Sequence, residues 1–169
     1  MLRYSTYHLR LTIHEKMRYW LFKSEPSTYS VDDLARDRTT AWTGVRNYQA
    51  RNFMRDEMRE GDRGFFYHSS CDEPGIVGIV EVCRPAHPDE TQFDRRSPYH
   101  DRAATRDNPR WYNVDVKLVK KTRLVGLDEL RRDKALKTLQ ILQRGNRLSI
   151  TPVTAAEWQR ILTLVKRET

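Results

Sequence analysis

The stretch "GIVGIVEVCR", residues 75–84, is apolar almost without interruption and rich in β-branched side chains. A run of this length is typical of a strand that is buried on both faces. The turn-forming sequence "DEPG" at residues 72–75 leads into it. We therefore expect residues 75–84 to form a central strand, around which the rest of a sheet is organised.

Candidate neighbours of this strand lie on both sides of it in the sequence. "RGFFYHS" at residues 63–69 predicts one strand, and "WYNVDVKLVKKTR" at residues 111–123 predicts another. The second stretch alternates apolar and polar residues, which indicates that one of its faces is buried. The side chains predicted on that face are Tyr112, Val114, Val116 and Leu118.

Shorter elements are predicted toward the two ends. "RYWLFKSEP" (residues 18–26) predicts a first strand that stops before its proline, and "RLSITPV" (residues 147–153) predicts a last one. One or two short helices are expected within residues 126–145. Three further helices have recognisable caps: Ser30 before "VDDLARD", Asn47 before a helix running to about Arg59, and Thr154 in a capping box with Glu157.

The order of these elements predicts the fold class. The strands are mostly not spaced as βαβ units, which favours a mixed or antiparallel sheet. We predict an α+β fold in which this sheet curves into a partly closed barrel with helices packed outside it. Residues 85–109 are polar and interrupted by prolines, so they predict a long loop, and loops of this length are usually functional.

Composition limits the class of protein. The 169 residues suit one domain, and a hydrophobic content of 38% with a mean hydropathy of −0.81 indicates a chain that folds in water. The formal net charge is +8 and the pI is about 9.7, which favours a polyanionic partner such as nucleic acid. The alternative reading of this charge is a basic surface that is merely solvated.

Cysteine and histidine spacing gives no sign of a metal site. Cys71 and Cys83 form no CxxC pair and fit reduced thiols inside a cell, and the five histidines never fall at HxxxH or HxH spacing. We expect neither a metal nor a cofactor. No apolar run has the ~20 residues of a membrane span. The expected location is the cytoplasm for a bacterial protein and the nucleus for a eukaryotic one.

The first sixteen residues look different from the rest. "MLRYSTYHLRLTIHEK" is basic and rich in hydroxyl groups, without an apolar stretch long enough for a signal peptide. We expect residues 1–16 to be an extension or a misassigned start, and residues 17–169 to form a single domain.

No complete catalytic constellation is visible. Nucleotide-binding glycine motifs and nucleophile elbows are absent from the sequence. On a strand, His68 faces away from both Tyr67 and Ser69, so it does not form a ready Ser–His pair. Glu25 and His68 are the candidates for acid/base chemistry, although for Glu25 we favour a carboxylate that is hydrogen-bonded to backbone amides in the KSEP turn.

Features of a base-binding site are more numerous. "WTGVRNYQARN" at residues 42–52 combines aromatic rings with amides and arginines. A base removed from its stack needs flat partners for its faces and polar groups for its edge. Ser24, Asn47, Gln49 and Ser69 supply such polar groups, and Gly44 allows the backbone to approach a ligand closely. The alternative is that Trp42, Tyr67 and Trp111 are ordinary core aromatics.

Six ordered motifs resemble those of the EVE domain family, and together they span Arg18 to about Val165. They are "YWLFKSEP", "WTGVRNYQARNFM", "GDRGFFYHS", "GIVGIVEV", "PRWYNVDVK" and "QRGNRLSITPV". The resemblance implies the fold of the PUA-like superfamily, a small, strongly curved β-barrel flanked by helices and similar to YTH domains. Membership of the EVE family also implies binding of modified bases in DNA or RNA, and the similar YTH domains read N6-methyladenine in an aromatic cage.

The resemblance implies a pocket at the mouth of the barrel. The residues expected to line it are Lys23, Ser24, Glu25, Trp42, Gly44, Val45, Arg46, Asn47, Tyr67, His68, Ser69, Arg144, Leu148 and Ser149. Within this set Trp42 is expected to stack on the base, and Asn47 to cap the following helix. The candidates for phosphate contact are Lys23, Arg46, Arg51 and Arg144, with Arg46 and Arg51 alternatively supporting the pocket through carboxylates such as Glu25.

The leading hypothesis is a non-enzymatic, monomeric module that binds a modified nucleobase in DNA or RNA. Two alternatives stay open. One is an RNA-binding accessory protein that recognises backbone shape, and the other is an enzyme acting on a modified base or nucleotide. The sequence does not distinguish DNA from RNA, because nothing in it identifies a contact to the 2′-hydroxyl.

Overall fold

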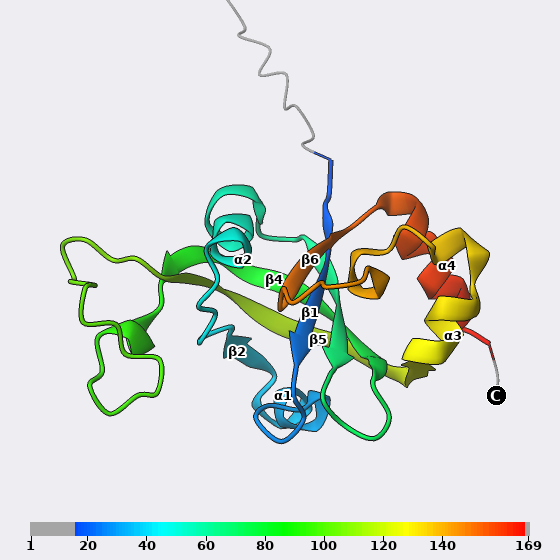
Figure 1. The fold of residues 1–169 in the computed structure, drawn as a ribbon, viewed down its shortest axis with the longest axis horizontal. Coiled ribbons are helices and arrows are strands. Elements are labelled where there is room, and N and C mark those ends of the chain that lie inside the picture. The colour runs from blue at the N-terminus through cyan, green and yellow to red at the C-terminus, as the bar shows by residue number, and fades with distance from the viewer. Residues whose placement is uncertain (1–15, 168–169) are drawn as a thin grey trace, which may run out of the picture.

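The computed structural model describes residues 16–167. Six strands and four α-helices follow one another in this part of the chain (Figure 1). The strands are β1 (Tyr19–Ser24), β2 (Thr39–Ala41), β3 (Arg63–His68), β4 (Gly75–Pro88), β5 (Tyr112–Gly126) and β6 (Ile150–Val153). The helices are α1 (Val31–Asp37), α2 (Tyr48–Asn52), α3 (Leu127–Arg132) and α4 (Ala155–Val165).

The strands form one mixed sheet in the order β2-β5-β4-β3-β1-β6. All neighbours pair antiparallel except β1 and β3, which run parallel with Trp20 opposite Gly64. The predicted α+β class, the mixed sheet and the central position of residues 75–84 are confirmed. The sheet nevertheless has two edges, β2 and β6, so the predicted barrel describes its curvature only loosely.

The helix caps agree with the sequence. The Ser30 and Thr154 side chains accept hydrogen bonds from the third amides of α1 and α4, each in a complete capping box. Asn47 Oδ1 accepts a hydrogen bond of 3.0 Å from the Ala50 amide. The helix predicted to run to Arg59 is shorter, because α2 changes after Asn52 into a π-helical turn at Phe53–Glu57.

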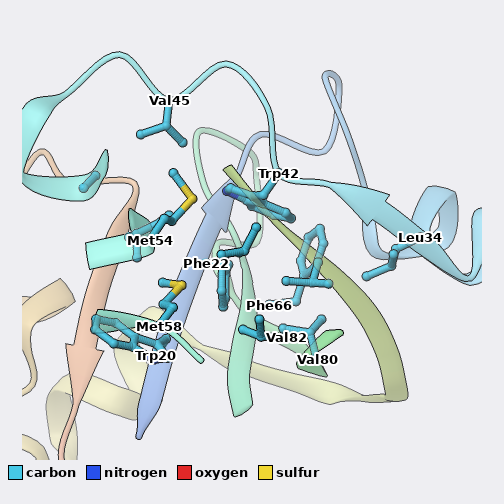
Figure 2. Packing of buried hydrophobic residues seen from close by; sticks show 14 of the residues in the cluster. Trp20, Phe22, Leu34, Trp42, Val45, Met54, Met58, Phe66, Val80 and Val82 are labelled. Carbon is cyan, nitrogen blue, oxygen red and sulfur yellow. The ribbon is translucent and has the colours of Figure 1, made fainter. Parts of the chain in front are cut away.

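Two hydrophobic clusters cover the two faces of the sheet. Successive residues of β1 and β3 alternate between them, as strand geometry requires. Phe22 and Phe66 belong to the cluster shown in Figure 2, whereas Leu21 and Phe65 belong to the cluster beneath α3 and α4. Gly64 is needed where the strands meet, because a Cβ there would lie 2.6 Å from the Phe22 ring.

Several boundaries differ from the prediction. Strand β4 continues to Pro88, so the loop that follows it is shorter than expected, and this loop begins with a 3-10 turn at Glu90–Gln92. Strand β5 also continues beyond the predicted end, to Gly126. Strand β2 has only three, partly exposed residues and was not predicted. Among residues 16–167, no helix is both long enough and apolar enough to cross a membrane. The predicted extension lies almost entirely in residues 1–15, outside the described residues.

Candidate functional site

A cleft of about 600 Å³ opens on the sheet face that carries the cluster of Figure 2. Four parts of the chain form its walls. The end of β1 with the turn that follows and the segment just before β6 make the first wall. The others are the segment from β2 to the start of α2 and the loop between β4 and β5. The lining residues are Lys23, Ser24, Glu25, Thr28, Tyr29, Thr40, Ala41, Trp42, Thr43, Gly44, Val45, Arg46, Asn47, Tyr99, Arg147 and Ser149.

The first wall is held by backbone hydrogen bonds. The Lys23 amide donates to the Ser149 carbonyl at 2.8 Å, and Ser24 Oγ donates to the Tyr29 carbonyl at 2.7 Å. The Glu25 carbonyl oxygen, not its carboxylate, accepts from the amides of Thr28 and Tyr29. The carboxylate of Glu25 therefore has no hydrogen bond within residues 16–167, which corrects the prediction that backbone amides satisfy it.

Trp42 forms the floor of the cleft. Its side chain packs edge-on against Phe22 and Phe66, with ring centroids 5.2 and 5.4 Å apart (Figure 2). Only 8% of the residue is exposed. The Trp42 amide donates to the Val114 carbonyl at 2.9 Å, which fixes the segment to β5. Trp42 is thus both a core aromatic and a cleft residue.

At Gly44, the wall formed by the segment from β2 to α2 contacts the loop between β4 and β5. Its φ of 82° lies in the left-handed region, and its amide donates to Asp89 Oδ2 at 2.9 Å. A Cβ at this position would lie 2.7 Å from the Tyr99 ring. The absence of a side chain therefore permits both the backbone turn and the contact with Tyr99.

Arg46 fastens the loop to this wall. Its Nη1 donates to Asp89 Oδ2 at 3.0 Å, and its Nη2 donates to the Tyr99 carbonyl at 2.7 Å and to Thr91 Oγ1 at 3.0 Å. The guanidinium also lies over the rings of Tyr99 and Trp111. Arg46 is therefore committed to Asp89, which corrects the expectation of a pairing with Glu25 and leaves little of its charge for a phosphate.

Asp89 is the buried carboxylate of this network. Besides Gly44 and Arg46, it accepts hydrogen bonds from the amide and the hydroxyl of Thr91, at 2.9 and 2.6 Å. Burial alone would raise the pKa of Asp89, but the hydrogen bonds from Thr91, Gly44 and Arg46 together outweigh it and hold the pKa below its usual value. The carboxylate is therefore charged at neutral pH and fixes the loop electrostatically.

Arg51 takes part in a neighbouring aromatic group. Its Nη1 donates to the Arg110 carbonyl at 2.8 Å, and its guanidinium lies 4.6 Å from the Tyr48 ring centroid. The Tyr48 ring stacks on Trp111 at 4.9 Å. Burial lowers the pKa of Arg51. Arg51 does not line the cleft, so the structure places it as a support for the loop rather than beside a ligand.

Residues 67–69 do not line the cleft. Tyr67 is buried in the cluster beneath α3 and α4, on the opposite face of the sheet. His68 Nε2 accepts a hydrogen bond of 3.0 Å from the Val31 amide, and burial lowers the pKa of His68. The Ser69 amide donates to the Ser24 carbonyl. The prediction that all three residues line the pocket is wrong. Strand alternation turns Tyr67 to the opposite face, whereas His68 shares the face of Phe66 but is taken up by the Val31 amide.

The segment before β6 is shifted relative to the prediction. Arg147 and Ser149 line the cleft, whereas Arg144 and Leu148 do not. Leu148 packs against the hydrophobic cluster instead. Arg147 is exposed and makes no hydrogen bond or ion pair with another described residue. Arg147 therefore takes the place in the cleft that was expected for Arg144.

Residues 18–164 match the family described as EVE domain. The chain belongs to the EVE domain family. The match covers β1 through most of α4, so every wall of the cleft is part of the EVE domain.

Curated relatives carry the name thymocyte nuclear protein 1. The EVE chain is 44% identical to the chicken protein over 166 residues, which covers 86% of this chain and 68% of the relative. It is 42% identical to the human protein over 170 residues, covering 89% of this chain and 75% of the relative.

Solved structures of similar proteins share the fold. A Pseudomonas syringae protein is 49% identical with a TM-score of 0.83, covering 86% of this chain and 98% of that one. Human THYN1, solved with DNA containing 5-methylcytosine, is 40% identical with a TM-score of 0.83, covering 90% and 99%. A Zygosaccharomyces rouxii YTH domain in complex with N6-methyladenosine RNA is 14% identical with a TM-score of 0.54 and shows the likeness of fold alone.

Sequence reasoning missed several cleft residues of this EVE domain. They are Thr28, Tyr29, Thr40, Ala41, Thr43, Tyr99 and Arg147. Tyr99 lies in the long loop whose length already indicated a function, so that loop was the signal available for it. Thr43 and Arg147 lie within two of the quoted motifs, and the others lie a few residues outside them; none carried a pattern of its own.

Proposed function

We propose that this EVE domain binds nucleic acid by receiving a modified base, 5-methylcytosine in DNA first among the candidates, in the cleft beside Trp42. The observation that carries the proposal is the cleft itself, which combines aromatic walls, a free carboxylate and free cations. The human relative solved with 5-methylcytosine-containing DNA supports the choice of ligand.

The size and walls of the cleft suit one base. Its volume of about 600 Å³ falls within the range of small-molecule sites. Tyr99 at the rim is 37% exposed and offers a ring for stacking, while Trp42 closes the floor. Stacking of one base on an aromatic ring contributes ~1–3 kcal/mol. A flipped base would therefore gain a large part of its binding energy from Tyr99 and Trp42.

The polar groups of the cleft suit the edge of cytosine. The Glu25 carboxylate, which has no partner among the described residues, is an acceptor for the exocyclic amino group of this base. Thr40 and Thr43 add hydroxyl groups nearby. Lys23 and Arg147 bring positive charge to the same cleft without any ion pair in residues 16–167, and they suit the phosphate of the flipped nucleotide.

Fluorescence anisotropy tests this function. Short DNA and RNA oligonucleotides are compared, unmodified or carrying 5-methylcytosine, 5-hydroxymethylcytosine or N6-methyladenine. We expect tighter binding to one modified base, and we expect this preference to persist at higher salt. Equal affinity for modified and unmodified strands would contradict base reading.

Paired variants locate the base within the cleft. Tyr99→Ala removes the exposed ring and should weaken binding about tenfold or more, whereas Tyr99→Phe keeps the ring and should bind as the wild type does. Glu25→Gln should reduce the preference for cytosine derivatives, because the amide offers a donor as well as an acceptor. Unchanged binding by Tyr99→Ala would contradict stacking on Tyr99.

One alternative function has an observation in its favour. The net charge of +8 suits recognition of an RNA backbone without reading a base. That function predicts affinity that falls steeply with salt and no preference for a modified base. The same binding series therefore separates the two functions.

A further inference from the structure

A second hollow, of about 660 Å³, lies on the loop between β4 and β5, which projects at the left of Figure 1. It is lined by two arginines, a histidine, an aromatic ring and an alanine: Phe93, Arg95, His100, Arg102 and Ala104. Among the described residues, no carboxylate lines it. A hollow with two guanidinium groups and no acidic side chain is suited to an anion.

The two guanidinium groups are available for a ligand. Arg95 and Arg102 make no hydrogen bond or ion pair with any residue in the described range 16–167. Arg96 and Arg106 of the same loop differ, because they pair with Asp94 at 3.4 Å and with Glu90 at 2.9 Å. The carboxylates of the loop thus neutralise Arg96 and Arg106 and leave the two arginines of the hollow unpaired.

The hollow is next to the base-binding cleft. Tyr99 lines the cleft, and the following residue, His100, lines the hollow. Consecutive Cα atoms are about 3.8 Å apart, so one short piece of chain separates the two sites. A nucleotide with its base in the cleft would extend its backbone along this piece of chain.

The loop is held in place before any ligand binds. The buried side chain of Gln92 donates to the carbonyls of Asp89 and Trp111, both at 2.8 Å, and accepts from the amide of Arg110. Trp111 Nε1 donates to Asp101 Oδ2 at 2.7 Å. These bonds tie the beginning and the middle of the loop to its last residues, directly before β5, so the arginines are presented on an ordered support.

We propose that this hollow binds a phosphate group of the nucleic-acid backbone, adjacent to the nucleotide whose base occupies the cleft. Its placement rests on the proposed function. Guanidinium groups bind phosphate oxygens through two parallel hydrogen bonds, which a solvated lysine does not match. The loop therefore extends the interface from one base to the polymer, and it favours a nucleic-acid strand over a free nucleoside as the ligand.

The test measures how affinity for a short DNA duplex with one central 5-methylcytosine depends on salt. The double variant Arg95→Gln with Arg102→Gln should bind more weakly, and the slope of log K against log salt should become shallower by about 1.8 if both arginines contact phosphate. Its preference for methylated over unmethylated duplex should stay as in the wild type.

Two further variants control for charge. Arg131→Gln with Arg132→Gln removes the same charge from α3, at the other end of the molecule, and should leave the slope nearly unchanged (Figure 1). Arg95→Lys with Arg102→Lys keeps the charge and should retain most of the slope. A slope for the Arg95 and Arg102 glutamine variant equal to that of the α3 variant would overturn the proposal.

The outcomes also separate this site from the base-reading cleft. If the Arg95 and Arg102 glutamine variant has a shallower slope and the wild type does not prefer the methylated duplex, the phosphate site is supported and base reading is contradicted. If the slope of that variant is unchanged and the wild type prefers the methylated duplex, base reading is supported and the phosphate site is contradicted.

Discussion

The two walls of the cleft are held by different forces. The wall formed by the end of β1 is part of the sheet, and its position follows from the backbone ladder with β3 and β6. The opposite wall, formed by residues 42–47 and Tyr99, depends on the buried Asp89 and on hydrogen bonds between segments about 45 residues apart in the chain. Sheet pairing tolerates many side chains, whereas the Asp89 network depends on particular ones.

Because of this difference, substitutions in the two walls should affect stability and ligand binding to different extents. Changes in the strand wall act on the core shared by the whole sheet. Changes in the loop wall alter the shape of the cleft through a few named contacts. The following predictions test this contrast, starting with the largest effect.

Asp89→Ala should cause the largest loss of stability. It removes the buried carboxylate that pairs with Arg46 and that accepts from the amides of Gly44 and Thr91. Breaking a buried ion pair from one side costs ~3–5 kcal/mol. Chemical denaturation measures the effect, and Asp94→Ala, an exposed carboxylate of the same loop, is the control, expected to lie within about 1 kcal/mol of the wild type.

The stability that the Asp89 network contributes should fall as the pH is lowered. The pKa of Asp89 is lower in the folded protein than in the unfolded chain. Its contribution is therefore complete above the unfolded pKa of about 4 and is lost as the pH falls through the folded pKa. Acid unfolding followed by circular dichroism should show this loss in the wild type and a weaker one in Asp89→Ala. Equal acid sensitivity would argue against the network.

Gly44→Ala should have the next largest effect. The substitution forces a side chain into the left-handed region and against the Tyr99 ring. Residues held in such a conformation cost ~1–3 kcal/mol each. Thermal unfolding measures this cost, and base binding should weaken as Tyr99 is displaced. Gly61→Ala is a control for the backbone alone, since Gly61 also has a positive φ but nothing within 4 Å of its Cβ position.

His68→Gln tests a smaller effect next to the strand wall, at the end of β3, which pairs with the end of β1. His68 accepts from the Val31 amide in its neutral form, and burial lowers its pKa below that of the unfolded chain. The wild type should therefore lose stability as the pH falls below about 6.5, because only the unfolded chain binds the proton. Glutamine can accept from the same amide without titrating. Denaturation at pH 7 and pH 5 should show a smaller pH effect in the variant.

Arg147→Gln should have the smallest effect, confined to binding. Its side chain lines the cleft without a protein partner, so its loss should weaken binding of DNA several-fold and leave stability unchanged. Arg144→Gln, an exposed arginine in the same segment that does not line the cleft, is the matched control. Equal losses from the two variants would mean that charge alone, and not position, matters in this segment.

Local patterns predicted the sheet and the helix caps well. The apolar run of residues 75–84, the capping residues Ser30, Asn47 and Thr154, and the alternation in β5 each act over a few neighbours, which a sequence displays directly. Strand alternation also predicted that Tyr67 and His68 face opposite sides. Placing both in one pocket contradicted that alternation, and the structure follows the alternation.

The loop wall could not be predicted in the same way. The partners of Asp89 lie at positions 44 and 46, and no local pattern connects residues so far apart in the sequence. Strand β2 is three residues long and partly exposed, so it has no periodicity to detect. The choice of Arg147 over Arg144 depends on how the turn before β6 is closed by Asn146, which is a property of the folded backbone.

The position of β1 in the sheet has a consequence for the order in which parts of the protein fold. Strand β1 lies between β3 and β6, so the first strand of the sheet has the last strand as its other neighbour. Contacts between segments so distant in sequence close large loops and slow folding. During synthesis β1 must wait for residues 150–153 to leave the ribosome before its second edge is covered. The cleft, whose first wall includes Ser149, is therefore among the last features of the molecule to form.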